Sequence, residues 1–363
     1  MARIEFDDVA HSYSGRPQSE ADYALKPIAH TWDDGGAYAL LGPSGCGKTT
    51  LLNITSGLVT PSQGRVLFDG EDVTAMPPEK RNIAQVFQFP VLYDTMTVEE
   101  NLAFPLRNRG APKAHVRKRV RAVAEMLELE GMLGRKAANL GAEEKQKISM
   151  GRGLVRDDVA AILFDEPLTV IDPHMKWVLR RKLRQIHAEF GHTLIYVTHD
   201  QTEALTFADK VVVMDDGRLV QTGTPQELFE NPAHTFVGYF IGSPGMNFLP
   251  CRIEGEAARV TPEVAIPLPE TLARRAARLS GALELGIRPS RMEVAPTADE
   301  GHCTATAETV EDLGSYALCL VTIGSRRVRV RVPEGRRVQP GERLGLRFPQ
   351  EWVRLYCDNE LVE

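Results

Sequence analysis

One run of the sequence, Gly42 to Thr50, limits the possible folds of this chain more than any other feature. It reads Gly-Pro-Ser-Gly-Cys-Gly-Lys-Thr-Thr, follows the apolar run Ala37 to Leu41 and leads into the segment Leu51 to Ile54. A strand, a tight turn and the start of a helix are the context in which Gly-x-x-x-x-Gly-Lys-Thr forms a phosphate-binding loop. The run therefore predicts a site for a nucleoside triphosphate. The alternative is a glycine-rich turn that precedes Lys-Thr by chance.

The residue types in this loop match the chemistry of a triphosphate. Its glycines let the backbone turn N–H groups inward, and these donors, with the N-terminus of the following helix, form a cradle for anions. Lys48 supplies a positive charge for the β- and γ-phosphates, and the hydroxyl of Thr49 is a ligand for Mg²⁺. We expect the nucleotide to be contacted by Gly42, Ser44, Gly45, Cys46, Gly47, Lys48, Thr49 and Thr50.

The composition is that of a soluble globular protein. Hydrophobic residues make up 43% and charged residues 25% of the chain, and the formal net charge of −6 gives no electrostatic reason to expect nucleic acid as a partner. The five cysteines are scattered and form no Cys-x-x-Cys pair, which argues against a disulfide framework and a zinc site. No apolar run approaches the ~20 residues that cross a bilayer, and the first residues do not resemble a signal peptide. We expect a cytosolic protein, whose role at a membrane would need a membrane-embedded partner.

The pattern of apolar residues changes along the chain and predicts two domains. In residues 1–240, strand-like and helix-like segments alternate, as in a P-loop α/β domain. In residues 241–363 the helical periodicity fades, and alternating runs such as Arg327 to Val332 predict half-buried strands in a small β-barrel. The clearest expected strands are Arg3–Phe6, Ala37–Leu41, Val159–Phe164, Thr193–Val197 and Val211–Met214, and the clearest helices are Lys113–Leu129 and Lys176–Phe190.

Two polar motifs follow predicted strands of the first domain. Phe164-Asp165-Glu166-Pro167 ends an apolar strand, where Asp165 is placed to hold Mg²⁺ and Glu166 to orient or deprotonate the attacking water. The alternative is an acidic loop pair without chemistry. His199 ends the next strand and could reach the γ-phosphate from the same edge of the sheet. His199 and Gln88 are weak signals when each is taken alone.

The order and spacing of these motifs resemble the ATPase subunits of ATP-binding cassette transporters, over the full length of the chain. In this resemblance, Gly42 to Thr49 is the Walker A motif, Gln88 lies in the Q-loop and Asp165 in the Walker B motif. Thr169 to Asp172 occupies the place of the D-loop, and His199 that of the switch histidine. The resemblance implies an α/β P-loop NTPase with a helical subdomain at about 89–158, followed by an all-β OB-like regulatory domain.

The same resemblance implies roles for individual residues. ATP and Mg²⁺ are the implied cofactors. Tyr13 stands where the family has an aromatic residue that stacks on adenine, and a packing aromatic on the first strand is an equally weighted alternative. The implied metal ligands are Thr49, Gln88 and Asp165, and the implied catalytic residues are Lys48, Gln88, Glu166 and His199.

The C-terminal part narrows the resemblance to carbohydrate importers. Ile241 to Pro244, Asn247 to Pro250 and Leu285 to Pro289 resemble the OB-like extension of maltose, multiple-sugar and glycerol-phosphate uptake ATPases. That implies uptake of a sugar, polyol or polyol phosphate, with glycerol or glycerol phosphate as the first guess. The implied assembly contains two ATPase subunits, two transmembrane permeases and a periplasmic or extracellular solute-binding protein, with this chain peripheral to the cytoplasmic face of the inner membrane. Phe89 to Thr97 would face the permease.

One motif departs from the family pattern. Where Leu-Ser-Gly-Gly-Gln is expected, the chain has Leu140, Gly141, Ala142, Glu143 and Glu144. In the family this segment closes over the γ-phosphate that the other subunit holds, so the two acids would set negative charge against phosphate. At ~4 Å, one such charge pair costs on the order of 1–4 kcal/mol near a surface. The alternative is that the acids satisfy the N–H groups at the start of their own helix. Gly151 and Gly153 in that helix could loosen it.

This departure leaves several arrangements open. Our hypothesis is a heterodimer, in which a second cassette ATPase supplies an intact signature to the P-loop of this chain. A subunit that binds ATP without hydrolysing it, in a structural or regulatory role, is the alternative. A soluble cassette ATPase of DNA repair or translation is disfavoured, because such proteins usually fuse two cassettes or carry long coiled-coil insertions.

Overall fold

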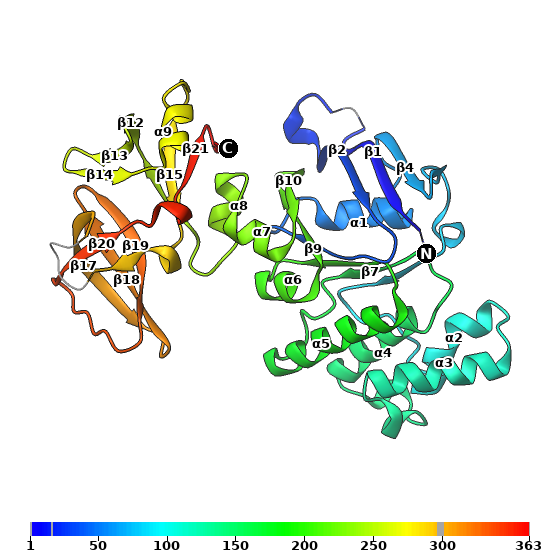
Figure 1. Cartoon of the computed structure of the whole chain (residues 1–363). Helices are drawn as coiled ribbons and strands as arrows, with labels where there is room; N and C mark the ends of the chain where they lie inside the picture. The colour runs from blue at the N-terminus through cyan, green and yellow to red at the C-terminus, as the bar shows by residue number, and fades with distance from the viewer. Residues whose placement is uncertain (1, 16, 296–300, 363) are drawn as a thin grey trace. The chain divides into compact units, whose positions relative to one another are not determined.

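The computed structural model describes residues 2–15, 17–295 and 301–362. These residues pack into two compact units, Met1–Pro225 and Gln226–Glu363 (Figure 1). Within the described residues, no helix combines the length and the apolar character that crossing a membrane would need. The first unit holds the glycine-rich loop, and the second holds the alternating arginines and valines.

A six-stranded sheet forms the centre of the first unit. Its strand order is β10-β9-β3-β8-β7-β6, and all neighbours are parallel except β10 and β9. β3 is buried at every position, as expected for a strand of a sheet that is covered on both faces. The strands are β3 (Ala37–Leu41), β6 (Ile83–Val86), β7 (Ala161–Asp165), β8 (Leu194–Thr198), β9 (Lys210–Asp215) and β10 (Arg218–Gly223).

A second, antiparallel sheet of four strands has the order β2-β1-β4-β5. Side chains of both sheets and of helix α1 (Lys48–Ser56) share one hydrophobic core, which includes Trp32, Leu51 and Val197. The helix that follows the glycine-rich loop is therefore anchored between two sheets (Figure 1). The strands are β1 (Ile4–His11), β2 (Leu25–Trp32), β4 (Gln63–Phe68) and β5 (Glu71–Asp72).

The elements expected from the sequence are present and differ from the observed ones mainly at their ends. Helix α5 (Pro173–Phe190) begins earlier than expected, because the Asp172 carboxylate caps it by accepting from the N–H groups of His174 and Met175. Helix α3 (Lys113–Met126) ends earlier than expected, before Glu128, whose φ of 57° is not helical. Helix α6 (Gln201–Phe207) follows β8.

Three helices lie between β6 and β7, in the region expected to be a helical subdomain. They are α2 (Val98–Asn108), α3 and α4 (Ala142–Leu154). Gly151 and Gly153 of α4 face other elements at very short range. A Cβ atom on Gly151 would lie 2.5 Å from Leu102 Cδ2, and one on Gly153 would lie 3.0 Å from Val86 Cγ2. The two glycines thus let α4 approach α2 and β6 closely. This close packing explains why glycines stand there, and it replaces the expectation that they loosen the helix.

Replacing Gly151 with alanine is expected to destabilise the protein. Alanine favours a helix by about 1 kcal/mol over glycine, but overpacking a core costs about 1–3 kcal/mol, so we expect a net loss of about 1 kcal/mol. Leu102 is fully buried in a closely packed core, so its side chain has little room to move aside. The free energy of unfolding in denaturant checks this. Gly131→Ala in the same subdomain, where a Cβ would meet nothing within 4 Å, is the matched control. An unchanged Gly151→Ala protein would contradict the prediction.

The second unit is built from antiparallel strands, and its main sheet has the order β16-β20-β17-β18-β19. β19 buries Val328, Val330 and Val332 and exposes the arginines between them, as its alternating sequence predicts. The remaining helices are α7 (Pro225–Glu230), α8 (Thr235–Phe240) and α9 (Glu270–Ala276). The strands are β11 (Asn247–Pro250), β12 (Arg252–Glu254), β13 (Ala257–Thr261), β14 (Val264–Pro267), β15 (Leu283–Ile287), β16 (Glu293–Val294), β17 (Cys303–Asp312), β18 (Tyr316–Ile323), β19 (Arg326–Pro333), β20 (Arg343–Arg347), β21 (Arg354–Cys357) and β22 (Glu360–Leu361).

The boundary between the units lies earlier than the expected one at residues 240 and 241. Packing divides the chain between Pro225 and Gln226, because α8 and nearly all of α7 associate with the β strands that follow them. The guanidinium of Arg288, at the end of β15, donates to the carbonyl oxygens of Phe229 at 2.6 Å and Ile241 at 2.5 Å. Helical segments that precede the β domain in sequence are therefore part of its packing.

Candidate functional site

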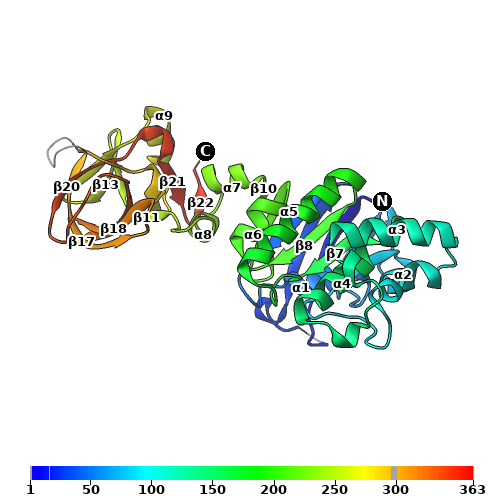
Figure 2. The ribbon, with the colours of Figure 1, turned by 90° about the horizontal axis from the view of Figure 1, so that it is seen from below.

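The topology of the central sheet brings three predicted motifs to one edge. β3 and β7 both pair with β8 in parallel, so the carboxyl ends of all three strands point the same way. The glycine-rich loop follows β3, Asp165 ends β7, and His199 follows β8. In open α/β sheets, ligands bind beyond the carboxyl ends of the strands. Segments far apart in the sequence thus form one candidate site, and Figure 2 shows β7 and β8 side by side with α1.

The backbone of the glycine-rich loop has the conformation that its glycines allow. Gly45 and Gly47 have φ angles of 83° and 97°, in the left-handed region that favours glycine. Gly47 caps the N-terminus of α1, and a Cβ atom there would lie 2.5 Å from the carbonyl oxygen of Ala24. A side chain at either position would distort the loop, so these glycines keep the N-terminal N–H groups of α1 available to an anion.

Lys48 is folded into the loop and is only 5% exposed. Its ammonium group donates to the carbonyl oxygens of Gly42 and Pro43, both at 2.9 Å, and lies 3.7 Å from the Cys46 sulfur. Burial raises the pKa of the Cys46 thiol, and the charge of Lys48 opposes that rise. The backbone of the loop therefore holds the positive charge of Lys48 in a fixed position.

Thr49 and Asp165 meet at the site. The Thr49 hydroxyl donates to Asp165 Oδ1 at 3.2 Å. Burial raises the pKa of Asp165, and neighbouring Glu166 adds to the rise, whereas the Thr49 hydrogen bond and the charge of Lys48 oppose it. A hydroxyl beside a carboxylate is a hard oxygen donor pair, which suits Mg²⁺. A cation would also relieve the cost of burying this carboxylate.

Glu166, His199 and Thr169 form a hydrogen-bonded group beside this pair. His199 Nδ1 lies 3.1 Å from Glu166 Oε2, and the Thr169 hydroxyl lies 3.3 Å from the same oxygen. The Glu166 side chain is 21% exposed and that of His199 is 54% exposed, so solvent reaches the group. Glu166 has a φ of 46°, which is uncommon for a non-glycine residue and is held by a bond from its N–H to the Val197 carbonyl. The sequence predicted Glu166 and His199 but gave Thr169 no role at this carboxylate.

Two further residues were predicted from the sequence, Gln88 and Tyr13. Gln88 follows β6 and is half-buried, and among the described residues no hydrogen bond joins its side chain to Thr49 or Asp165. Tyr13 is 67% exposed, and its hydroxyl lies 3.2 Å from that of Thr50 on α1. An aromatic ring so exposed is not a core residue, so its position favours a platform beside the loop over the packing alternative. The structure brings Tyr13 to the start of α1, whereas the role of Gln88 as a metal ligand stays a prediction.

The acidic segment at the start of α4 is partly neutralised within the chain. Glu143 pairs with Lys147 at 3.0 Å, one turn further along the helix. Lys145 of the same helix pairs with Asp94 at 3.0 Å. A carboxylate oxygen of Glu144 lies beside Gly141, where it would be 2.7 Å from an added Cβ. Negative charge at a helix N-terminus is favourable, so local pairing accounts for part of this motif.

A residue that the sequence did not single out connects this helix to the site. Gln146 of α4 is fully buried, and its amide nitrogen donates to the carbonyl oxygen of Pro167 at 2.8 Å. Pro167 directly follows Glu166, so the acidic helix and the Glu166 loop are tied by one side chain. In the sequence, Gln146 is a glutamine among charged residues of a helix. That pattern does not predict a buried side chain that bonds to another loop.

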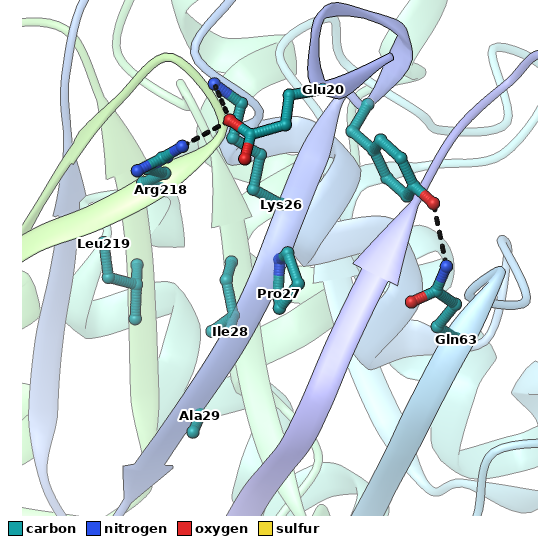
Figure 3. A pocket seen from close by; sticks show the side chains of 9 residues that line it. Glu20, Lys26, Pro27, Ile28, Ala29, Gln63, Arg218 and Leu219 are labelled. Atoms are coloured by element: carbon teal, nitrogen blue, oxygen red, sulfur yellow. Dashed lines mark hydrogen bonds and ion pairs between the residues drawn. The ribbon is translucent and has the colours of Figure 1, made fainter. Parts of the chain in front are cut away.

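A pocket of about 570 Å³ is lined by residues of β2 and β10, among them Lys26 and Arg218 (Figure 3). Arg218 and Glu20 form an ion pair on its wall at 2.5 Å, and Lys26 pairs with Asp216 at 2.6 Å. The N–H group of Gly217 donates to the carbonyl oxygen of Cys46 at 3.3 Å, so the turn after β9 supports the glycine-rich loop from behind. Both cations that line this pocket, Lys26 and Arg218, are paired with acids of the chain.

Comparison with known proteins identifies the family. The family model described as ABC transporter matches residues 25–169, and those of the MalK OB fold domain and the TOBE domain match residues 242–292 and 285–355. The chain is 38% identical over 361 residues to the sn-glycerol-3-phosphate import ATP-binding protein UgpC of Paraburkholderia xenovorans (strain LB400), covering 98% of both chains. The chain belongs to the ABC transporter family. UgpC of Escherichia coli O157:H7 is also 38% identical, over 98% of both chains.

Solved structures of ABC ATPases share the fold. CbiO1 of Clostridium perfringens, part of the ABC transporter complex cbiONQ, is 28% identical with a TM-score of 0.57, covering 63% of this chain and 90% of that chain. The ATP-binding cassette MJ0796, solved as a dimer bound to ADP and phosphate, is 27% identical with a TM-score of 0.54, covering 61% and 98%. The predicted ATPase fold, the OB-like all-β extension and the prediction of an ATPase subunit of an importer are therefore confirmed.

Proposed function

We propose that this ABC subunit hydrolyses ATP with the residues gathered at the edge of its central sheet. Lys48 and the N–H groups of the loop bind the β- and γ-phosphates. Thr49 and Asp165 hold Mg²⁺, which neutralises phosphate charge when it is bound. Glu166 orients the attacking water and His199 contacts the γ-phosphate. The observation that carries this proposal is the 3.1 Å contact of His199 with Glu166 beside the Thr49 and Asp165 pair.

We also propose that the transported solute is a polyol phosphate, with glycerol phosphate as the first candidate and sugars and other polyols as the related class. The proposal rests on the names of the similar import proteins and on the matches to the MalK OB fold and TOBE domains. The chain would sit on the cytoplasmic face of the inner membrane, with two permeases and an external solute-binding protein. Uptake of labelled glycerol 3-phosphate by cells with and without this chain tests it. Equal uptake would contradict the first candidate.

The surface after Gln88 supports the expected contact with a permease. Phe89 is 68% exposed, Val91 52% and Tyr93 41%, so several apolar side chains of this segment face solvent. Exposed apolar patches of this kind mark interaction sites in soluble proteins. We assign Phe89 to Thr97 to the permease contact.

We further propose that this chain pairs with a second ATPase subunit that carries an intact signature motif. Glu143 is compensated by Lys147, yet Glu144 has no cationic partner at salt-bridge distance among the described residues. Residual negative charge would face the phosphates held by the partner. Purification of a fully active native transporter with this chain as its sole ATPase would contradict the heterodimer. The same acids favour the second candidate, a subunit that binds ATP without hydrolysing it, which site-resolved hydrolysis in the complex would distinguish.

Removing the two acids is expected to speed the assembled ATPase. A double substitution, Glu143→Gln with Glu144→Gln, removes repulsion of phosphate, which at ~4 Å is worth on the order of 1 kcal/mol or more near a surface. We expect the rate of ATP hydrolysis by the complex to rise about fivefold or more. The matched control is Glu125→Gln with Glu130→Gln, two exposed acids of the same subdomain. An equal change in both proteins would contradict a role of Glu143 and Glu144 at the partner's site.

A further inference from the structure

A buried carboxylate lies directly behind His199. Glu203 of α6 is 3% exposed. Its Oε2 atom accepts hydrogen bonds from the Tyr196 hydroxyl at 2.9 Å and the Thr198 hydroxyl at 2.8 Å. Its Oε1 atom lies 3.2 Å from the ammonium group of Lys176 on α5, close enough for an ion pair although not aligned as a hydrogen bond. No step of the proposed hydrolysis uses this group.

The surroundings of Glu203 explain why a carboxylate is tolerated there. Burying an ionised carboxylate is costly unless it is paired and hydrogen-bonded. All three partners are donors, which suits a group that only accepts. Burial and the nearby Glu203 raise the pKa of Tyr196, so its hydroxyl keeps the proton that it donates. Lys176 is 24% exposed at its side chain, so the buried cluster reaches solvent only through this lysine.

Hydrogen bonds around Glu203 involve the residues on both sides of His199 in the sequence, Thr198 and Asp200. Thr198 precedes His199, and its hydroxyl, besides donating to Glu203, accepts from the N–H group of Asp200 at 3.0 Å. The Asp200 carboxylate in turn caps α6 and accepts from the N–H group of Glu203 at 3.1 Å. The backbone on each side of His199 is therefore tied to the start of α6.

Through Lys176, the Glu203 carboxylate is also linked to the segment that carries Glu166 and Thr169. Lys176 lies in the first turn of α5, which begins at Pro173, shortly after Thr169. The Thr169 hydroxyl bonds Glu166, the partner of His199. Helices α5 and α6 pack against each other and lie together in Figure 2. One buried carboxylate thus joins the turn that presents His199 to the helix that follows the Glu166 loop.

We propose that Glu203 is a positioning residue for ATP hydrolysis. It fixes the β8–α6 turn against α5, so that His199 Nδ1 stays within reach of Glu166 Oε2. It does not contact nucleotide itself. This inference rests on the roles proposed above for Glu166 and His199. It adds that the distance between these two side chains depends on Glu203, a carboxylate outside the site.

A double-mutant cycle in the full-length chain, assembled with its transporter partners, tests the inference. Glu203→Gln keeps the shape of the side chain but removes the charge that pairs with Lys176. We expect the rate of hydrolysis to fall about tenfold with KM for ATP unchanged, because the loop that binds phosphate is untouched. In the His199→Ala background, Glu203→Gln should cause no further loss. Single-turnover measurements with protein in excess over ATP resolve the slow rates.

Two further sets of variants separate positioning from folding. Thr198→Val should slow hydrolysis as Glu203→Gln does, whereas Thr198→Ser, which keeps the hydroxyl, should restore the rate. Val120→Ala, a substitution of a buried residue on α3, should lower the melting temperature without changing the rate.

The outcomes separate the positioning role of Glu203 from the role proposed for His199. A Glu203→Gln rate within twofold of wild type, or full additivity with His199→Ala, overturns the positioning role while leaving the role of His199 intact. Normal hydrolysis by His199→Ala overturns both.

Discussion

Glu166→Gln is expected to lower ATP hydrolysis at the site of this chain by about 10²–10⁴-fold, the range that a positioned general base contributes. The amide keeps the shape of the carboxylate and can still approach His199, but it cannot accept a proton from water. Lys48, Thr49 and Asp165 are untouched, so ATP should still bind and should remain trapped unhydrolysed. The measurement is single-turnover hydrolysis in the assembled transporter, together with the amount of ATP retained after gel filtration.

A matched control for this variant is Glu71→Gln on β5, an exposed acid outside the site. It changes the net charge of the protein by the same amount and should leave both readings at wild-type values. Unchanged turnover by the Glu166→Gln complex would show that Glu166 is not the water-orienting group. Loss of ATP binding would instead point to a structural role in the loop that its φ of 46° already strains.

Lys48→Met is expected to weaken ATP binding and to lower hydrolysis about 100-fold or more. The ammonium group is held in the curve of the loop by two carbonyl oxygens at 2.9 Å, so its charge is positioned before the nucleotide arrives. A charge that is already in place stabilises a transferring phosphoryl group without the cost of reorganisation that the same charge would pay in solution. Titration with a fluorescent ATP analogue measures the affinity, and steady-state phosphate release measures the rate.

Lys26→Met provides the comparison for Lys48→Met. Lys26 is also a buried lysine of the first unit, at 8% exposed, but it pairs with Asp216 in the turn between β9 and β10. Its loss should cost little stability, because the Asp216 side chain is 84% exposed, and should change ATP affinity little. If both lysine variants bind ATP equally well, the phosphate role of Lys48 is wrong.

Much of the site could be predicted because its residues follow strands. The loop from Gly42 to Thr50, the acid pair Asp165 and Glu166, and His199 each come directly after a run of apolar residues that reads as a buried strand. The carboxyl ends of parallel strands meet at one edge, so position in the sequence implies position in space. The ends of helices were less well predicted, as at α5, because a cap such as Asp172 shifts a boundary without changing the apolar pattern.

Long-range packing accounts for what could not be predicted. Gly151 and Gly153 are unfavourable in a helix by propensity alone, and only the approach of Leu102 and Val86 explains them. The observed boundary between the units lies at Pro225, earlier than the expected one. The reason is that Arg288, far along the chain, donates to carbonyl groups in the helical segment before the β domain.

By itself, the sequence determined the nucleotide chemistry of this protein and its family, because the loop, the acid pair and the histidine are short local motifs whose residue types specify their chemistry. Only the tertiary structure decided what holds that chemistry in place. Glu203 looked like an ordinary charged residue of a short helix, and Thr169 like part of a loop. The role proposed for Glu203 depends on Tyr196 and Thr198 of β8 and on Lys176 of α5, and no local pattern encodes which side chains will meet in a core.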